Sequence, residues 1–290
     1  MIEQLRERDA LMQSIRAFFR AEGFDEVETP LVLKTPCMEL NIDAIPSGDG
    51  FLRTSPELSH KKLLARGAEK IFEIGKCFRQ GERGRLHNPE YTMLEWYRVN
   101  SDYMTALTDT QALLSNVSKH WKTIGLSAQP TSNAWKIFSI EEVFEEFAGW
   151  NPVEGFDADR FDLDLIEKVE PALPTDCPVV LKDYPAELCA LARLKPGNPK
   201  VAERWELYLG GVEIANAYSE LTDPVEQRAR FEHWGEQRRA LGKEVYPIDE
   251  EFIQALENMP PTSGVALGVD RLLMILMGAT TLDAVLPFRR

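Results

Sequence analysis

Clustered metal-binding residues are missing from this sequence. None of its four cysteines forms a C-x-x-C pair, and its four histidines show no zinc-ligand spacing. These absences argue against a structural metal, and the cysteines are expected to be reduced, structurally incidental thiols. The residues concerned are Cys37, Cys77, Cys177 and Cys189, with His60, His87, His120 and His233.

Long apolar runs are also missing. No apolar stretch approaches the ~20 residues of a membrane span. Residues 1–20 are charged and amphipathic and lack the apolar segment of a secretory signal, so a cytoplasmic protein is expected. Hydrophobic residues still make up 44% of the chain, which is enough for an ordinary core in one large domain or two small ones.

Positive charge is scarce as well. The chain has 33 Lys and Arg against 47 Asp and Glu, which gives a formal net charge of −14. A broad nucleic-acid surface needs clustered Lys and Arg to neutralise phosphates, so any tRNA contact would have to be local. Neither GxGxxG nor GxxxxGK[ST] occurs, and no internal repeat is present.

Strand patterns dominate without a regular βαβ rhythm, which predicts an α+β fold with a mainly antiparallel sheet flanked by helices. Predicted helices span 2–22, 103–124, 224–241, 249–258 and 270–277, and another begins at Pro56 with Ser55 as N-cap. Predicted strands span 24–29, 51–53, 70–79, 91–99, 178–181 and 265–269, with two more within 203–218 around Gly210-Gly211. Loops are expected at 80–89 and 195–200, and a more variable helical insertion at about 103–200.

The strand after the first loop combines acid and aromatic groups. Period-two alternation places Tyr91, Met93, Glu95 and Tyr97 on one face. A carboxylate between two tyrosines could bind an ammonium ion by charge and by cation–π contact. A solvent-facing strand with aromatic cross-strand pairs would show the same spacing.

Two further patterns suit phosphate and metal chemistry. Gly268 to Arg271 places an arginine at a helix N-terminus after a buried strand, where a phosphate could bind, although an Asp cap beside a solvated arginine is the alternative. Glu206, Glu213 and Glu220 recur every seven residues among apolar neighbours. Burying unpaired acids is costly, so magnesium with ATP and a cationic substrate would explain them, while half-exposed acids on an edge strand are the alternative.

In order and spacing, these signals resemble the catalytic core of the class II aminoacyl-tRNA synthetases, specifically that of lysyl-tRNA synthetase. Residues 8–30 resemble motif 1, 72–97 motif 2, 264–276 motif 3, and 210–221 the lysine-specific segment. The resemblance covers nearly all of the chain. It implies a single catalytic domain over residues 1–290, a homodimer formed through motif 1, and ATP with Mg²⁺ as cofactors.

The resemblance also implies roles in ATP binding. Arg79 would contact the α-phosphate and stabilise charge as pyrophosphate leaves, and Arg271 would bind the γ-phosphate. Glu206 and Glu213 would hold the magnesium ion, and Tyr91 would stack on adenine. The complete expected ATP-binding set is Arg79, Glu82, His87, Asn88, Glu90, Tyr91, Glu206 and Arg271.

The amino-acid substrate would lie against a second set of residues. Glu57 would receive the amine near the carboxylate, while Glu95 and Glu220 suit the side-chain ammonium of lysine. Catalysis of this type is mostly positioning and charge stabilisation. The complete expected substrate-binding set is Ser55, Glu57, Glu95, Tyr97, Asn216, Tyr218, Glu220, Ala266 and Gly268.

Three departures separate the chain from lysyl-tRNA synthetases. No β-barrel that would read an anticodon precedes motif 1, so no anticodon-binding domain is expected. Ala266 stands where those enzymes usually have glycine, and one extra methyl on a pocket wall can change substrate preference by ~1–3 kcal/mol. The motif 2 acid comes one place late, at Glu82 after Gly81, and Arg85 is displaced likewise; Glu82 is expected to substitute.

The first two departures are shared by a paralogous family, the elongation factor P–lysine ligases. Residues 84–90, 93–98 and 263–271 resemble that family more closely than the synthetase. Its members adenylate a lysine, preferably (R)-β-lysine, and transfer it to the ε-amine of a lysine on elongation factor P, a tRNA-shaped protein. The resemblance therefore implies an ATP-dependent ligase whose acceptor is elongation factor P and not tRNA.

Two other interpretations remain open at this point. The chain could be a lysine-adenylating paralogue with another acceptor, such as a minimal tRNA or a small amine. It could also be a non-catalytic, synthetase-like regulatory subunit. The presence of Arg79, Arg271, Glu206 and Glu213 speaks against the second, because such a subunit need not keep phosphate-binding and metal-binding groups.

Overall fold

The computed structural model describes residues 2–123 and 134–289. Its strands are β1 Asp25–Glu26, β2 Val32–Leu33, β3 Pro46–Ser47, β4 Gly50–Leu52, β5 Lys70–Phe78, β6 Glu90–Val99, β7 Lys136–Ser139, β8 Val179–Pro185, β9 Leu194–Lys195, β10 Asn198–Leu209, β11 Val212–Ser219 and β12 Thr262–Gly268. Its α-helices are α1 Ile2–Ala21, α2 Glu57–Leu64, α3 Tyr103–Thr123, α4 Ile140–Phe147, α5 Ala158–Asp164, α6 Glu170–Ala172, α7 Pro224–Ala240, α8 Glu250–Leu256 and α9 Val269–Leu276. A π-helical segment, Leu165–Val169, joins α5 to α6, and 3₁₀ turns span Ala186–Leu188 and Leu282–Ala284.

A nine-stranded sheet runs through the molecule in the order β1-β5-β6-β12-β11-β10-β8-β7, with β9 paired to β10. The edge pairs β1–β5 and β7–β8 are parallel, and the pairs between them are antiparallel. A small separate sheet has the order β2-β4-β3. The predicted α+β fold, with a mainly antiparallel sheet flanked by helices, is confirmed.

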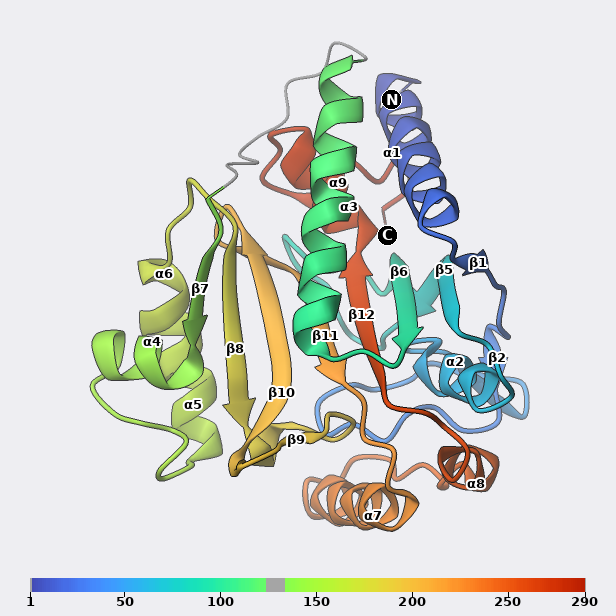
Figure 1. Cartoon of the computed structure of the whole chain (residues 1–290), viewed down its shortest axis with the longest axis vertical. Helices are drawn as coiled ribbons and strands as arrows, with labels where there is room; N and C mark the ends of the chain where they lie inside the picture. The colour runs from blue at the N-terminus through green and yellow to red at the C-terminus, as the bar shows by residue number, and fades with distance from the viewer. Residues whose placement is uncertain (1, 124–133, 290) are drawn as a thin grey trace.

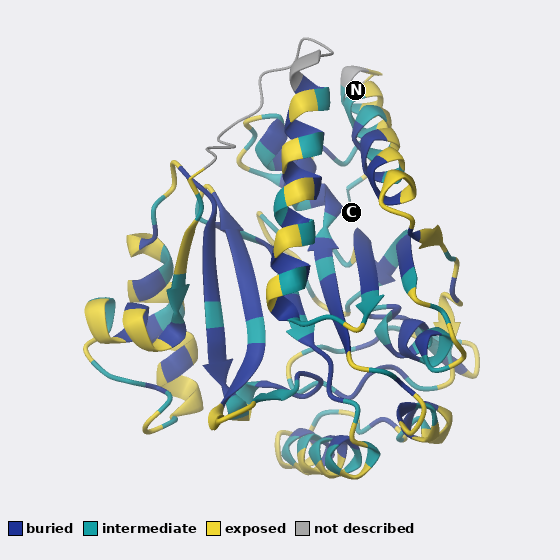
Figure 2. Cartoon of the chain, in the orientation of Figure 1, coloured by how far each residue is buried: buried dark blue, intermediate teal, exposed yellow. Residues whose placement is uncertain are grey.

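One face of the sheet is covered by α1, α3 and α9. Figure 1 shows α3 crossing in front of the central strands, and it contacts β10, β11, β12 and α1. Alternate residues of the central strands, such as Leu94, Trp96 and Leu267, are buried in this layer. The outward faces of α1 and α3 are exposed, as Figure 2 shows. The apolar half of each alternating strand therefore faces these helices, and the polar half is left for the opposite face.

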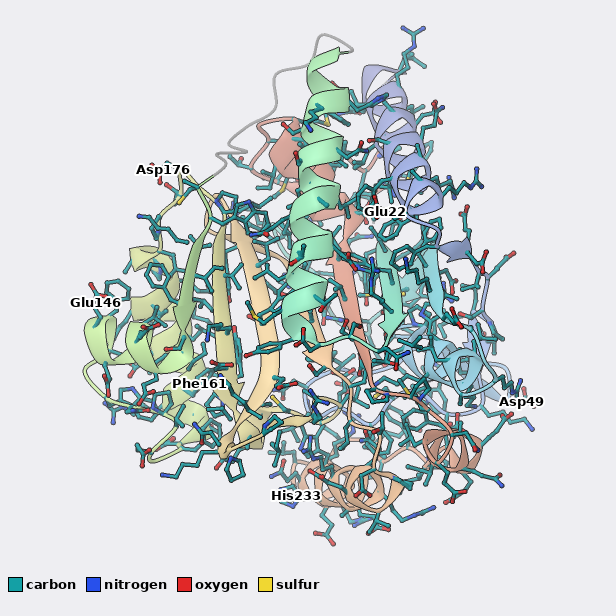
Figure 3. All side chains as sticks on the ribbon, in the orientation of Figure 1. Glu22, Asp49, Glu146, Phe161, Asp176 and His233 are labelled. Carbon is teal, nitrogen blue, oxygen red and sulfur yellow. The ribbon has the colours of Figure 1, made fainter. Side chains whose placement is uncertain are left out.

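Two smaller clusters flank this core. The helices α4 to α6 lie beside β7 and β8, where Phe144 and Phe161 stack with ring centroids 4.6 Å apart (Phe161 is labelled in Figure 3). At one end of the sheet α7 and α8 pack together, and α8 contacts α2. None of the helices within the described residues is long and apolar enough to cross a membrane.

Turn chemistry explains the central hairpin. Gly210 and Gly211 have φ values of 58° and 74°, and they form the two-residue turn between β10 and β11. Positive φ at both positions matches the twist of the paired strands, and glycine adopts it without strain. The two strands predicted around these glycines are confirmed.

The predictions were less accurate elsewhere. The expected loop at 195–200 is wrong, because Pro196 and Gly197 alone make a tight turn and β10 begins at Asn198. The insertion predicted as helical contains the edge strand β7, whose four residues are too few to show a strand pattern. The helix predicted from Pro56 begins at Glu57, with Pro56 at the N-cap position. Residue 124 of the helix predicted at 103–124 and residues 125–133 of the predicted insertion lie outside the described residues.

Candidate active site

Strand pairing builds a polar row across the sheet face that α1, α3 and α9 leave free. Residues at paired positions of neighbouring strands project from the same face. The row therefore places acidic, amide and methyl groups from five strands side by side. In sheet order its members are Glu73, Glu95, Ala266, Asn216 and Glu206. A second row beside it holds Tyr97, Gly264, Tyr218 and Arg204.

A cavity of about 360 Å³ lies over these two rows. Every site residue expected from the sequence lines it except Glu90. Glu90 is exposed at the start of β6, with its Oε1 3.1 Å from Lys76 Nζ. Successive side chains of a strand alternate in direction, so Glu90 points away from the face that carries Tyr91. The structure thus brings the predicted residues together from motifs far apart in sequence, and leaves Glu90 outside.

One end of the cavity is positively charged. The Arg79 guanidinium lies 5.2 Å from the ring centroid of Tyr91, and its Nη1 is 3.5 Å from Glu82 Oε1. Arg271 donates to the main-chain oxygen of Glu213 at 2.8 Å, and its Nη2 lies 2.8 Å from His87 Nε2. Burial and the charge of Arg271 lower the pKa of His87, which favours the neutral ring as an acceptor. Two guanidinium groups held in this way suit the oxygens of a triphosphate.

Glu206 and Glu213 lie in the cavity wall near this end. Glu206 Oε2 accepts hydrogen bonds from Tyr184 Oη at 2.6 Å and Tyr208 Oη at 2.9 Å. Burial and then the charge of Glu206 raise the pKa of Glu213, although Arg271 opposes the rise. Among the described residues, no group of three or more His, Cys, Asp or Glu could hold a metal. Two repelling carboxylates beside these guanidinium groups would nevertheless fit Mg²⁺, which takes its other ligands from phosphates and water.

Elsewhere the cavity wall holds carboxylates that contact one buried lysine. Lys61 Nζ is fully buried and lies 2.6 Å from Glu57 Oε1 and 2.6 Å from Glu220 Oε2. Burial alone would lower the pKa of Lys61, but Glu220 and Glu57 outweigh burial and raise it. Burial raises the pKa of Glu220 to about 8, against the opposing charge of Lys61. Glu220, expected to serve the substrate ammonium, therefore already shares one oxygen with Lys61.

Glu95 is held from several sides. Ser55 Oγ donates to its Oε1 at 2.6 Å, and Tyr97 Oη donates to its Oε2 at 2.9 Å. Ser55 Oγ also accepts the N–H of Glu57 at 3.0 Å, which ties the start of α2 to this carboxylate. His60 Nδ1 lies 3.6 Å from Glu95 Oε2. These contacts fix the carboxylate in the floor of the cavity, where it is 1% exposed.

A buried network supports Glu95 from behind. His60 Nε2 lies 2.9 Å from Glu73 Oε2, and Arg53 Nη2 lies 2.7 Å from Glu73 Oε1. Burial opposes the ionisation of Glu73, but His60, Arg53 and Thr29 outweigh it and hold the pKa at about 2. Burial likewise opposes charge on His60, but Glu73 and Glu95 raise its pKa above the ordinary value. The network therefore places the His60 ring, with its pKa raised, directly behind Glu95.

Sequence reasoning missed several residues of the site. Arg204 precedes Glu206 by two positions on β10, so strand alternation could have placed it on the same face. Lys61 follows Glu57 by four positions, a spacing that pairs side chains on one helix face. Glu39 lines the cavity from a segment with no regular pattern, and no sequence signal pointed to it.

Comparison with known proteins agrees with this geometry. The family model described as tRNA synthetases class II (D, K and N) matches residues 1–290. An elongation factor P–(R)-β-lysine ligase of Vibrio cholerae is 36% identical over 308 residues, covering 99% of this chain and 95% of the relative. The ligases of that name from Photorhabdus laumondii and Haemophilus influenzae are 37% and 35% identical, with the same coverage.

Proposed function

The chain belongs to the class II tRNA synthetase family, in the group of the elongation factor P–(R)-β-lysine ligases, and from this we propose that it activates (R)-β-lysine or lysine with ATP and transfers it to a lysine of elongation factor P. In the first step a substrate carboxylate oxygen attacks the α-phosphorus of ATP, the aminoacyl-adenylate forms, and pyrophosphate leaves. In the second step the neutral ε-amine of the acceptor lysine attacks the acyl carbon. An amide bond forms, AMP leaves with the bonding electron pair, and the amine loses a proton.

The two ends of the cavity carry this proposal. Arg79 and Arg271 bring positive charge to one end, and Glu95 and Glu220 lie at the other. A lysine isomer has the complementary arrangement, with a carboxylate at one end and an ammonium group at the other. The substrate would therefore bind with its carboxylate toward the phosphates and its side-chain ammonium toward Glu95.

The individual roles follow from that orientation. Arg79 would stabilise charge on the α-phosphate as pyrophosphate leaves, and Arg271 would hold the γ-phosphate. Electrostatic groups that are already in place for the transition state supply a large part of catalysis in sites of this kind. Glu206 and Glu213 would hold Mg²⁺, which supplies further positive charge to the phosphates.

The remaining binding roles concern the adenine and the substrate chain. Tyr91 would stack on adenine, with Glu82, His87 and Asn88 near the phosphates. Tyr97, Asn216 and Tyr218 would surround the substrate chain. Ala266 pairs in register with Glu95 on one side and Asn216 on the other, so its methyl group would limit the space beside the substrate.

Assembly and the acceptor are part of the same proposal. Residues 8–30 would form the interface of a homodimer, as motif 1 does in the family. A protein acceptor in place of tRNA accords with the net charge of −14, which disfavours a broad phosphate-binding surface. A translation factor as acceptor places the reaction in the cytoplasm.

An intact-mass experiment tests the proposal. The enzyme is mixed with ATP, Mg²⁺ and the host elongation factor P, together with (R)-β-lysine or L-lysine. We expect the factor to gain the mass of one lysyl group, and omission of ATP to abolish the gain. Adenylate formation without a mass gain would refute elongation factor P as the acceptor. Absence of pyrophosphate exchange with both isomers would refute the activation chemistry itself.

A further inference from the structure

Glu39 occupies an anchored position in the cavity wall. It lies on the segment between β2 and β3, and its side chain lines the cavity. Arg238 of α7, which is 0% exposed, is hydrogen-bonded to this segment. Its Nη1 donates to the main-chain oxygens of Glu39 at 2.7 Å and Ile42 at 3.0 Å, and its Nη2 donates to Asp43 Oδ1 at 2.7 Å. A buried guanidinium with several acceptors fixes the segment, so the carboxylate of Glu39 extends from a well-defined backbone.

The carboxylate of Glu39 is not paired within the part of the chain that the structure describes. The charged groups that act on the pKa of Glu39 are Arg79, Glu57, Arg204 and Glu95, in decreasing order of effect. Both arginines already have acidic partners elsewhere, since Arg79 contacts Glu82 and Arg204 contacts Glu206. A carboxylate that faces a cavity and has no cationic side chain paired with it among the described residues is available to a cationic ligand.

Position along the cavity indicates which ligand group would reach it. Arg79 marks the end at which the substrate carboxylate meets the α-phosphate, and Glu57 is the expected acceptor of the adjacent amine. The segment that carries Glu39 lies directly beside Arg79, because the N–H of the next residue, Gln80, donates to the main-chain oxygen of Asp43 at 2.7 Å. Glu39 therefore belongs to the half of the cavity nearer the reacting group.

We propose that Glu39 is a further substrate-binding residue, which together with Glu57 accepts the amine that lies next to the reacting carboxylate. The inference rests on the proposed function, because it assigns this amine to the end of the cavity that carries Arg79. Glu57 alone is a weak acceptor, since its Oε1 is already 2.6 Å from Lys61 Nζ. A second, unpaired carboxylate completes the site for a substrate with two amines.

The protonation of the Glu39 carboxyl group before substrate binds supports the proposal. Burial raises the pKa of Glu39 to about 7, with Arg79 opposing the rise and Glu57 adding to it. Near neutral pH the carboxylate is thus close to half protonated when the cavity holds no cation. An ammonium group beside it would favour the charged form, so substrate binding should expel a proton.

Binding calorimetry with two ligands tests the proposal. L-lysine carries both amines, whereas 6-aminohexanoic acid lacks the amine next to the carboxylate. We expect Glu39→Gln to weaken L-lysine binding about tenfold or more, as loss of a charged hydrogen bond does. Binding of 6-aminohexanoic acid should stay within about twofold of the wild type. Asp49→Asn is the matched control, because Asp49 is exposed and lies at the edge of the molecule in Figure 3.

The same titrations measure the proton. At a pH near 7, L-lysine binding in two buffers of different ionisation enthalpy should release about half a proton more from the wild type than from Glu39→Gln. Equal weakening of both ligands by Glu39→Gln, or no weakening of either, would overturn the inference while leaving the proposed function intact. A wild-type protein that binds neither ligand and catalyses no pyrophosphate exchange would overturn the proposed function, and the inference with it.

Discussion

Lys61 Nζ lies 2.6 Å from Glu220 Oε2, and the two side chains are 0% and 1% exposed. The same nitrogen lies 2.6 Å from Glu57 Oε1. The cavity thus contains its own cation, which cancels one of the two negative charges of Glu57 and Glu220. Unpaired buried carboxylates would otherwise take up protons and lose their attraction for an ammonium group. The internal lysine therefore holds both acids in place, and when both are ionised one net negative charge remains for the substrate.

Removal of this internal cation should destabilise the protein. Lys61→Met leaves the buried carboxylate of Glu220 and the partly buried carboxylate of Glu57 without a counter-ion, and breaking one partner of a buried ion pair costs about 3–5 kcal/mol. Lys62→Met is the control, since Lys62 pairs with Asp249 and Glu251 nearer the surface and should cost less than about 1 kcal/mol. Denaturant unfolding of the two variants measures the difference. Similar losses of stability would contradict the role assigned to Lys61.

The charge of Arg271 should matter for the chemistry and little for lysine binding. Arg271→Ala removes a guanidinium from the phosphate end, and loss of one such electrostatic group lowers a rate by about 10²–10³-fold. Lysine affinity should stay within about threefold, because Arg271 lies at the end of the cavity away from Glu95. Pyrophosphate exchange and lysine titration measure the two effects. Arg66→Ala is the control, because the side chain of Arg66 is exposed and pairs with Glu251 at the surface, and a rate equal to that control would contradict the prediction.

Gly264 should tolerate no side chain. A Cβ atom added there would lie 2.3 Å from Tyr97 Cε1 and 2.4 Å from Glu220 Oε1. Both atoms belong to buried groups that cannot move freely, so Gly264→Ala should lower the free energy of unfolding by about 1–3 kcal/mol. Gly268→Ala on the same strand is the control for stability, because its nearest contacts would be 3.8 Å away. Equal stability of the two variants by thermal unfolding would refute this reading of the packing.

The parts of the site that lie on straight strands could be predicted from the sequence. The side chains of Tyr91, Glu95 and Tyr97 share a face because β6 is a regular strand with period-two alternation. Glu206 and Asn216, in contrast, face each other only because an irregularity between Leu207 and Tyr208 shifts by one residue the register that the Gly210-Gly211 turn begins. The local pattern decides the placement on β6, so local reasoning found it, whereas no pattern in the sequence revealed the shift on β10 and β11.

Residues whose burial depends on distant partners could not be predicted in this way. His60, Lys61 and Lys62 stand in a polar stretch of α2 that would suit a solvent-facing helix. His60 and Lys61 are buried only because Glu73 and Glu220 meet them from β5 and the end of β11. The partners are separated from α2 by up to about 160 residues in sequence, and no periodicity links them. Tertiary pairing, not local propensity, decides which charges of this helix enter the site.

The stabilisation that lysine gives the protein should grow with pH. Burial raises the pKa of Glu39 to about 7 and of Glu220 to about 8, from an ordinary value of 4.5. Without lysine, the folded protein therefore binds these two protons more tightly than the unfolded chain does. The stability that the protonated carboxyl groups contribute is present below pH 4.5 and is lost as the pH rises through about 7 to 8. Lysine stays cationic over this range and stabilises the charged carboxylates, so the increase in Tm at saturating lysine should be larger at about pH 8 than at about pH 5.5. Thermal unfolding at constant ionic strength measures it, with KCl in place of lysine as the control. An increase that is equal at both pH values, or larger at the lower one, would show that these two carboxylates do not face the ligand.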